Sequence, residues 1–289
     1  MSSFYLTGFA DEAAPDLGGQ IRALQDNAIE FVELRGVDGI NIGEMKADKA
    51  KDVARRLADG GIRVSCLGSP IGKTFLDQPY APVTEMMNRL LETASILGTK
   101  RIRVFSFYLP AGIEASACRS EVIDRLGRLL DLADDAGSQL LHENERDIYG
   151  DTRERCLDLH QALGVRLRGI LDPANYLLVG TDPLAAMHDL FDWIDYLHIK
   201  DVRLRDTRIV PAGYGDGRIS DILALIAKKP GSPFLSIEPH LTLFAGRDKL
   251  EHDPGGVMPA TADEFVYPDG PAAFAAAVAA CRNLVHLMG

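Results

Sequence analysis

The chain has 289 residues, a formal net charge of −11 and a sequence pI near 5.1. So acidic a chain is not expected to bind the phosphate backbone of nucleic acids, which requires a basic face. Hydrophobic residues are 46% and charged residues 25%, the balance of an ordinary soluble domain. No apolar stretch approaches the length of a membrane span, so we expect no membrane partner. Because the chain is acidic, we expect no nucleic-acid partner either.

The cysteines give no sign of a disulfide framework or a CxxC metal site. They are widely spaced, at Cys66, Cys118, Cys156 and Cys281. Reduced thiols in a cytoplasmic protein are the simplest interpretation. The opening MSSFYLTGFADE has no basic segment and no long apolar run, so it does not resemble a signal peptide. We therefore expect a cytoplasmic protein.

Short apolar runs alternate along the chain with longer segments of helical periodicity. Continuous apolar runs of this length are typical of strands buried on both faces, as in a parallel sheet. Eight runs are predicted as strands, and they begin at Phe4 (FYLTGFA), Phe31 (FVELRGV), Arg63 (RVSCLG), Arg101 (RIRVFSF), Gln139 (QLLHENE), Leu167 (LRGILDPAN), Ile194 (IDYLHIKD) and Pro233 (PFLSIEPH).

Amphipathic helices are predicted between these strands. Apolar residues at helical spacing run from Val83 to Leu97, from Val122 to Ala133 and from Phe274 to Met288. Glycines placed just past predicted helix ends supply left-handed caps, at Gly60–Gly61, Gly98 and Gly137.

Eight strand-then-helix units favour a single (β/α)8 TIM barrel spanning residues 1–289 over an open doubly wound sheet. No GxGxxG follows the first strand, which weakens a dinucleotide-binding interpretation. The longest irregular stretches, 69–82 and 241–270, follow the third and eighth strands, at the barrel end where active sites are built. Whether the second stretch, with Arg247, Lys249 and Asp253, is a lid or an oligomer contact is left open.

The last four predicted strands each end in an ionisable residue. These are Glu143, Asp172, His198 and Glu238, about one strand-helix unit apart. Three carboxylates that face one another repel, and a divalent cation is the natural compensation. One imidazole with three carboxylates suits Mn²⁺, Mg²⁺, Co²⁺ or Zn²⁺. We predict one divalent metal site at the barrel mouth; the competing interpretation makes each group a separate cap or salt bridge.

The chain resembles the sugar phosphate isomerase/epimerase group of the xylose-isomerase-like barrels. The resemblance covers nearly the whole chain and rests on an ordered set of strings: GFADEAAPDLGGQI, FVELRGVDGINI, LLHENERDIYGDT, ILDPANYLLVG, YLHIKDVR, PAGYGDGRI and LSIEPHL. It implies that Glu143, Asp172, His198 and Glu238 hold the metal. It also implies that the two glutamates lie on opposite sides of the substrate and move a proton beside a carbonyl. Such chemistry needs a Lewis acid on the carbonyl and a carboxylate on each face.

Four more residues near the strand ends are candidate substrate ligands. Lys200 either holds a substrate hydroxyl or phosphate or pairs with Asp201 or Asp172. Arg203 is a candidate clamp further along the same loop. The other two are His240, which shares a direction with Glu238 if the strand continues, and Asn175. His240 is otherwise an orienting neighbour or a loop histidine, and Asn175 a turn residue.

Other ionisable residues around the mouth have two interpretations each. Glu12 and Arg35 either pair with each other, which we favour, or line the pocket. His142 is expected to point away from the pocket because it alternates with Glu143. Glu145 is a rival to Glu143 on the same face; Glu143 is preferred because it lies closer to the strand end and matches the family's position. The glycine-rich stretch 211–218 either covers the pocket or forms a plain turn cluster.

The predicted function is that of a divalent-metal-dependent isomerase or epimerase of a small ketose or keto-polyol, acting by proton transfer beside a carbonyl. We lean towards an unphosphorylated substrate, because no cluster of phosphate donors is obvious. A metal-dependent dehydratase or lyase on a keto-polyol begins with the same proton abstraction and is the main alternative. The substrate, the stereocentre, the metal and any homo-oligomer are left open.

Two further functions are weighed and disfavoured. An apurinic endonuclease-like phosphodiesterase needs several more histidines, and neither Asn175 nor the strand ends at 68–69 and 106–107 supply them. The acidic pI also disfavours duplex DNA. A non-catalytic sugar-binding barrel would not need to keep four intact ligand positions.

Overall fold

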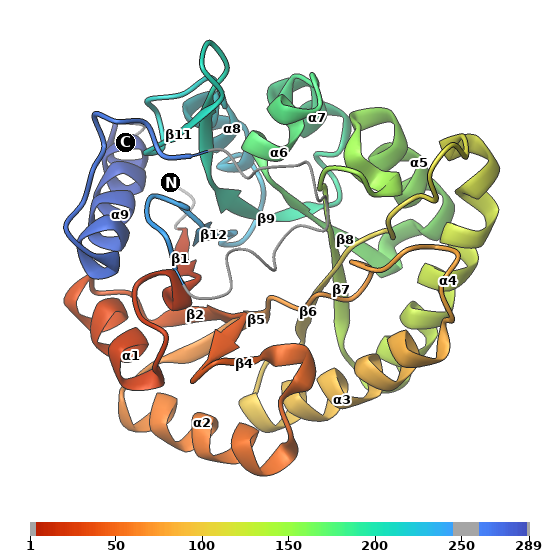
Figure 1. Cartoon of the computed structure of the whole chain (residues 1–289), viewed down its shortest axis with the longest axis horizontal. Helices are drawn as coiled ribbons and strands as arrows, with labels where there is room; N and C mark the ends of the chain where they lie inside the picture. Colours follow the sequence, from red (N-terminus) through yellow and green to blue (C-terminus); the bar gives the residue numbers. More distant parts are fainter. Residues whose placement is uncertain (1–3, 245–259, 288–289) are drawn as a thin grey trace.

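The computed structural model describes residues 4–244 and 260–287. An eight-stranded parallel sheet curls into a nearly closed barrel, with helices around its outside (Figure 1). The strands follow the order β1-β12-β9-β8-β7-β6-β5-β2, and β1 and β2 at the two ends lie next to each other. They are β1 (Tyr5–Gly8), β2 (Phe31–Leu34), β5 (Arg63–Leu67), β6 (Arg101–Val104), β7 (Gln139–Glu143), β8 (Leu167–Leu171), β9 (Ile194–Ile199) and β12 (Phe234–Ile237).

All eight predicted strands and the TIM-barrel fold are confirmed. Two short antiparallel hairpins, which the sequence did not predict, accompany the barrel. One pairs β3 (Gly36–Val37) with β4 (Ile40–Asn41), and the other pairs β10 (Asp201–Arg203) with β11 (Arg208–Val210). Each follows the carboxyl end of a barrel strand, where loops of this fold carry function.

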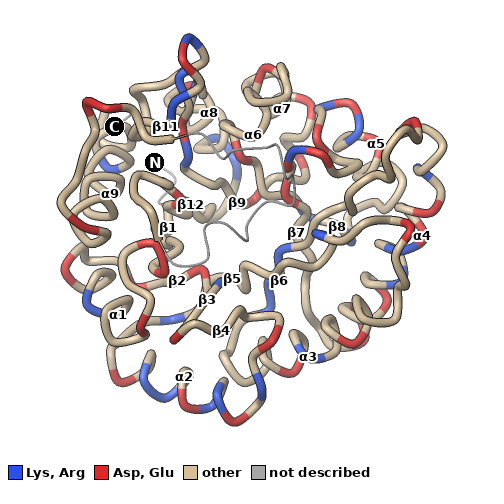
Figure 2. The backbone as a smooth tube through the Cα atoms, viewed as in Figure 1, with Lys and Arg blue, Asp and Glu red and all other residues tan. Residues whose placement is uncertain are grey.

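Many charged residues lie on the outer helices, where Lys and Arg are interspersed with Asp and Glu (Figure 2). Predicted helices at 83–97, 122–133 and 274–288 are confirmed, except that Met288 lies outside the described residues. Gly61, Gly98 and Gly137 take left-handed φ values of 72°, 71° and 64° after their helices. The α-helices are α1 (Leu17–Asp26), α2 (Ala47–Asp59), α3 (Ala81–Leu97), α4 (Ala115–Asp135), α5 (Arg153–Leu163), α6 (Pro173–Leu178), α7 (Pro183–Asp189), α8 (Ile219–Ile226) and α9 (Gly270–His286).

The apolar core has two parts. Most of it lies between the strands and the surrounding helices. A smaller cluster fills the barrel interior, formed by Cys66, Leu141, Ile170, Tyr196 and Phe234. The four cysteines are buried free thiols. Within residues 4–244 and 260–287, no helix combines the length and apolar character that crossing a bilayer would require. The cytoplasmic location stays a prediction.

The glycine-rich stretch 211–218 folds around one buried carboxylate. Asp201 accepts backbone hydrogen bonds from Gly213 and Gly215 at its Oδ2, and from Gly217 and Val202 at its Oδ1, at 2.9–3.0 Å. A Cβ on Gly215 would lie 2.3 Å from Asp201 Oδ1, so only glycine fits there. This stretch is thus a turn cluster built on Asp201; a role in covering a substrate stays a prediction.

Asp201→Asn is expected to destabilise the protein. The amide loses the charge that four N–H groups share and presents donors to some of them, so the free energy of unfolding should fall by about 2 kcal/mol. Urea denaturation measures this loss. Asp206→Asn in the same hairpin is the matched control, because its ion pair with Arg203 is exposed. Equal unfolding midpoints for the two variants would contradict the role assigned to Asp201.

Candidate metal centre

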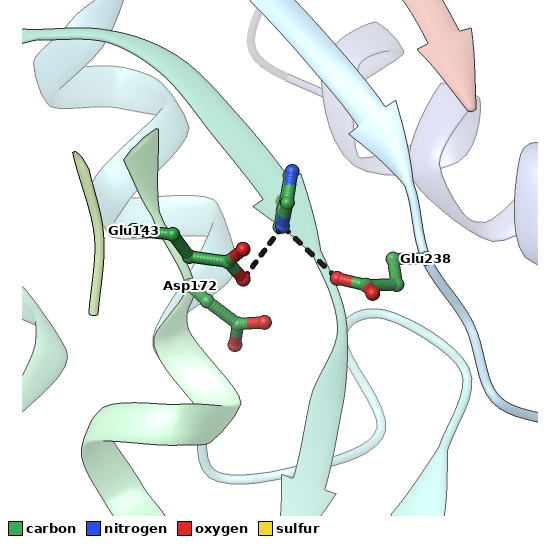
Figure 3. A group of neighbouring side chains, drawn as sticks. Glu143, Asp172 and Glu238 are labelled. Carbon is green, nitrogen blue, oxygen red and sulfur yellow. Dashed lines mark hydrogen bonds and ion pairs between the residues drawn. The ribbon is translucent and has the colours of Figure 1, made fainter. Parts of the chain in front are cut away.

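Four predicted metal ligands converge at the mouth of the barrel. Glu143 ends β7, Asp172 caps the N-terminus of α6, His198 lies on β9 and Glu238 follows β12. All four are buried, and one ligand atom from each lies within 4.8 Å of the others. Figure 3 shows Glu143 and Glu238 approaching from two sides, with Asp172 beside Glu143. The convergence expected from the strand ends is therefore present.

The imidazole of His198 lies between carboxylates on both of its nitrogens. Its Nδ1 is 2.9 Å from Glu143 Oε1 and 2.9 Å from Glu238 Oε2. Its Nε2 is 3.2 Å from Glu33 Oε2. Burial alone would lower the pKa of His198, but these three carboxylates raise it well above the ordinary value. The side chain is therefore an imidazolium at neutral pH unless another cation takes over its charge.

The donor set fits one divalent cation. Nδ1 carries at most one hydrogen, yet two carboxylate oxygens lie at equal distance from it. Glu238 Oε2 and Asp172 Oδ2 are buried oxygens without a hydrogen bond of normal geometry to any described residue. One nitrogen and three carboxylates are ligands that Zn²⁺, Mn²⁺ and Co²⁺ accept.

Asp172 makes a different contact with each oxygen. Oδ1 accepts the backbone N–H of Asn175 at 3.0 Å, and Oδ2 lies 2.8 Å from Lys200 Nζ. Burial raises the pKa of Asp172 to about 7, although the Lys200 ammonium opposes this. Two ion-pair partners were predicted for Lys200, Asp201 and Asp172. Lys200 pairs with Asp172, because the backbone of the glycine-rich stretch 211–218 encloses Asp201. A substrate contact by Lys200 stays a prediction.

Two charged residues of the site were missed because they lie inside apolar strands. Glu33 on β2 accepts hydrogen bonds at Oε2 from Tyr196 Oη at 2.8 Å and Ser236 Oγ at 2.6 Å, as well as facing His198. Arg103 on β6 lies 3.1 Å from Glu143 Oε2. A charged residue in an otherwise apolar strand can itself indicate a functional site, because a buried charge requires a partner of opposite charge or a metal ion.

Glu33 orients His198 from the side opposite the cluster. Burial raises its pKa, but the His198 charge and the donated hydrogen bonds outweigh burial and lower it. An ionised Glu33 holds the proton on Nε2 and so leaves Nδ1 available as a ligand.

The choice between Glu143 and Glu145 follows from their partners. Glu145 Oε2 pairs with Lys73 Nζ at 2.9 Å, outside the converging group. Glu143, as preferred, lies within that group.

His142 points away as expected: its Nε2 is 3.0 Å from Ser106 Oγ, and burial lowers its pKa to about 3.

Asn175 and Arg203 have structural partners. Asn175 donates from Nδ2 to Asn144 O at 3.0 Å, which ties the end of β8 to that of β7. Arg203 lies on the β10–β11 hairpin and pairs with Asp206 and Glu264, both well exposed. None of these contacts joins Arg203 to the four converging residues. Substrate binding by either residue stays a prediction.

Glu12 and Arg35 pair, as favoured, with Nη2 3.3 Å from Oε1. Arg35 also binds Asp11 through two hydrogen bonds and lies 3.1 Å from Glu238 Oε1. It therefore lines the site as well. Burial raises the pKa of Glu12 to about 8 despite Arg35.

His240 reaches the site by a turn rather than along the strand. Strand β12 ends at Ile237, and His240 has a left-handed φ of 49°. His240 was expected to share a direction with Glu238 only if the strand continued. The strand does not continue, because the backbone turns at His240. The ring nonetheless lies beside Glu12 and Glu238, with Nε2 3.3 Å and 3.6 Å from their Oε1 atoms. Burial lowers the pKa of His240 to about 3. Of the long stretch 241–270, the part with Arg247, Lys249 and Asp253 lies outside the described residues.

Metal uptake should release protons in a number that depends on pH. A ligating imidazole must be neutral, so His198 loses about one proton near pH 8. Because the pKa of Asp172 is about 7, that carboxylate adds nearly a second proton near pH 6. Apparent Zn²⁺ affinity should fall roughly tenfold or more per pH unit below neutrality. Calorimetry in buffers of different ionisation enthalpy counts the protons, and no release at either pH would contradict the ligand assignment.

Glu33→Gln should weaken metal binding by about 10–100-fold, because the amide cannot fix the His198 tautomer as a carboxylate does. Equilibrium dialysis with Zn²⁺ measures the affinity. Glu145→Gln is a matched control for loss of one buried carboxylate near the mouth and should change affinity much less. If Glu33→Gln binds Zn²⁺ as tightly as the wild type, the orienting role is wrong.

The comparisons agree on the architecture. The model of the xylose isomerase-like TIM barrel family matches residues 21–253. Similar solved structures include IolI protein with a bound zinc atom (TM-score 0.76, 16% identity, covering 99% of each chain). L-Ribulose 3-epimerase has a TM-score of 0.73 at 16% identity over 100% of this chain and 96% of that one. The probable 3-DHS dehydratase AsbF from Bacillus anthracis has a TM-score of 0.67 at 18% identity over 82% and 92%. At these identities the solved structures show the fold alone. No curated protein matches the chain.

Proposed function

Because the chain belongs to the xylose isomerase-like TIM barrel family, we propose that it is a divalent-metal-dependent isomerase or epimerase of a small ketose or keto-polyol. One observation carries the proposal. Two buried glutamates, Glu143 and Glu238, approach the same imidazole nitrogen of His198 from two sides, each at 2.9 Å. Moving a proton from one face of a carbon to the other requires a base on one face and an acid on the other, and such a pair of carboxylates can fill both roles.

Glu143, Asp172, His198 and Glu238 would hold the metal, which when bound supplies Lewis-acid polarisation of a substrate carbonyl. Each glutamate also has one oxygen fixed from behind by a buried arginine: Arg103 holds Glu143 Oε2, and Arg35 holds Glu238 Oε1. The second oxygen of each is directed at the centre. The two carboxylates are thereby positioned before substrate arrives, which lowers the cost of reaching the reactive arrangement.

Glu238 is ionised in the metal-free site. Burial would raise its pKa, but Lys200 and His198 outweigh burial and hold the pKa well below the ordinary value. In the proposed reaction one glutamate removes the proton from the carbon beside the carbonyl. The other glutamate must enter the step protonated, and it gives its proton to the opposite face, which inverts that carbon and exchanges the protonation states of the two glutamates. Return of the proton to the carbonyl carbon, with transfer of the neighbouring hydroxyl proton to the carbonyl oxygen, isomerises the ketose instead.

Two similar structures bear on the substrate. L-Ribulose 3-epimerase and D-allulose 3-epimerase from Methylomonas sp. are named for ketose substrates, which supports a ketose here. The probable dehydratase AsbF supports a second candidate, elimination of water after the same first step. Both candidates use the same residues to remove the first proton.

Deuterium exchange separates these candidates. The metal-loaded protein is incubated in D₂O with a panel of ketoses and keto-inositols, and the products are followed by NMR and mass spectrometry. Label at one carbon without loss of water is expected. An unsaturated product would select the dehydratase instead. No label in any compound, with the metal shown to be bound, would count against both.

Glu143→Gln and Glu238→Gln should each lower the exchange rate by at least about 10³-fold, because an amide can neither accept nor return the proton. Glu145→Gln, which changes the rival carboxylate two residues away, should stay within about tenfold of the wild type. Rates are compared at saturating metal, so weaker metal binding does not imitate a catalytic loss. A larger loss in Glu145→Gln than in Glu143→Gln would reverse the assignment.

A further inference from the structure

Two groups of potential metal ligands share Glu238. The first is the centre described above. The second consists of Glu12, Glu238 and His240, which are buried and offer ligand atoms within 4.8 Å of one another. Glu238 Oε2 faces His198 Nδ1 at 2.9 Å, and Oε1 faces the second group, 3.6 Å from His240 Nε2. A carboxylate that directs one oxygen into each of two donor groups is placed as a bridge between two cations.

Arg35 already lies in the second group. Its side chain is 4% exposed, and its guanidinium lies 3.1 Å from Glu238 Oε1 and 3.3 Å from Glu12 Oε1. Two further hydrogen bonds, of 2.9 and 3.0 Å, bind it to Asp11. Phe9 covers the guanidinium at 4.4 Å from the ring centroid. A fixed positive charge therefore stands among the oxygens that a second metal ion would use.

His240 supplies an independent sign of a cation site. Its Nε2 is buried, with the residue 2% exposed, and it makes no hydrogen bond of normal geometry to any described residue. The nitrogen nevertheless points at the carboxylates of Glu12 and Glu238. The left-handed backbone of His240 and its N–H bond to Glu12 Oε2, at 2.8 Å, hold the ring there. A buried nitrogen without a partner is costly unless a ligand uses it.

We propose that Glu12, Glu238 and His240 form a latent second divalent-cation site, and that Arg35 fills it and so limits the centre to one metal ion. The guanidinium neutralises the same oxygens as a second ion would, but it is not a Lewis acid, so it can neither coordinate a substrate oxygen nor convert a bound water into hydroxide. This restriction suits proton transfer beside a carbonyl, whereas paired metal ions suit the hydrolysis of phosphate esters. The inference rests on the proposed metal centre and concerns its stoichiometry.

Metal stoichiometry tests the inference without relying on activity. Wild type and Arg35→Gln are stripped of metal and dialysed against Mn²⁺, and bound metal is counted by elemental analysis. We expect one Mn²⁺ per chain for the wild type and two for Arg35→Gln. In that variant we also expect the EPR signature of a spin-coupled pair, because Glu238 would join the two ions.

Three control variants isolate the cause. Arg35→Lys keeps the positive charge and should bind one Mn²⁺. Arg35→Gln combined with His240→Ala removes a donor of the second group and should return to one. Arg103→Gln removes an equally buried arginine from the other glutamate, beside which the described residues offer no second donor group, and should also bind one.

Several outcomes would overturn the inference. A wild type that binds two ions shows that Arg35 excludes nothing, and a folded Arg35→Gln that binds one shows that no latent site exists. Should Arg35→Gln fail to fold, Arg35→Met is refolded with and without Mn²⁺. Failure of both also overturns the inference, because a cation that replaces the arginine would restore the fold. A wild type that binds no metal at all contradicts the proposed function instead.

Discussion

The site depends on an excess of buried negative charge around one imidazole. Glu33, Glu143 and Glu238 all lie within 3.2 Å of a His198 nitrogen, inside a protein that excludes water from them. Carboxylates so close together are costly unless cations offset them. Buried cations stand behind several of them: Arg103 behind Glu143, Arg35 behind Glu238 and Lys200 beside Asp172. None of these three lies at Nδ1 itself, where the remaining negative charge converges.

The barrel places this charge through its register. Thr7 on β1, Ser236 on β12 and His198 on β9 are adjacent in the parallel pairing, so they form one level inside the barrel. Apolar side chains and Tyr196 fill the interior near that level. The hydroxyl groups of Thr7 and Tyr196 are both hydrogen-bonded to the Ser65 hydroxyl, and Tyr196 Oη also donates to Glu33 Oε2. Hydroxyl groups and the His198 imidazole thus share one level above the apolar cluster, and Ser236 and Tyr196 there donate to Glu33.

The sequence predicted what depends on local pattern. Strands buried on both faces give continuous apolar runs, and a charged residue that ends such a run is conspicuous; this is why the eight strands, Glu143, Asp172, His198 and Glu238 were found. Glu33 and Arg103 were not, because a run that is apolar on both sides does not show which residues face the interior. The direction of the His240 side chain depends on its left-handed backbone. Lys200 pairs with Asp172 because glycines distant in sequence enclose the other candidate partner, Asp201. Contacts of that kind are set by tertiary structure and leave no periodic trace in sequence.

The choice between epimerisation and dehydration concerns the second proton, because both reactions begin with loss of the first. Epimerisation needs an acid on the opposite face of the carbon, and Glu143 and Glu238 approach the centre from two sides. Dehydration needs a donor to the departing hydroxide, and the ammonium of Lys200, next to Asp172, is the group of the described site suited to that task. Lys200 is buried and has its charge engaged by Asp172, whereas each glutamate has an oxygen already directed at the centre. For the proposed function, this arrangement supports return of a proton to carbon, whereas dehydration would use an N–H of Lys200 that is not directed at Asp172.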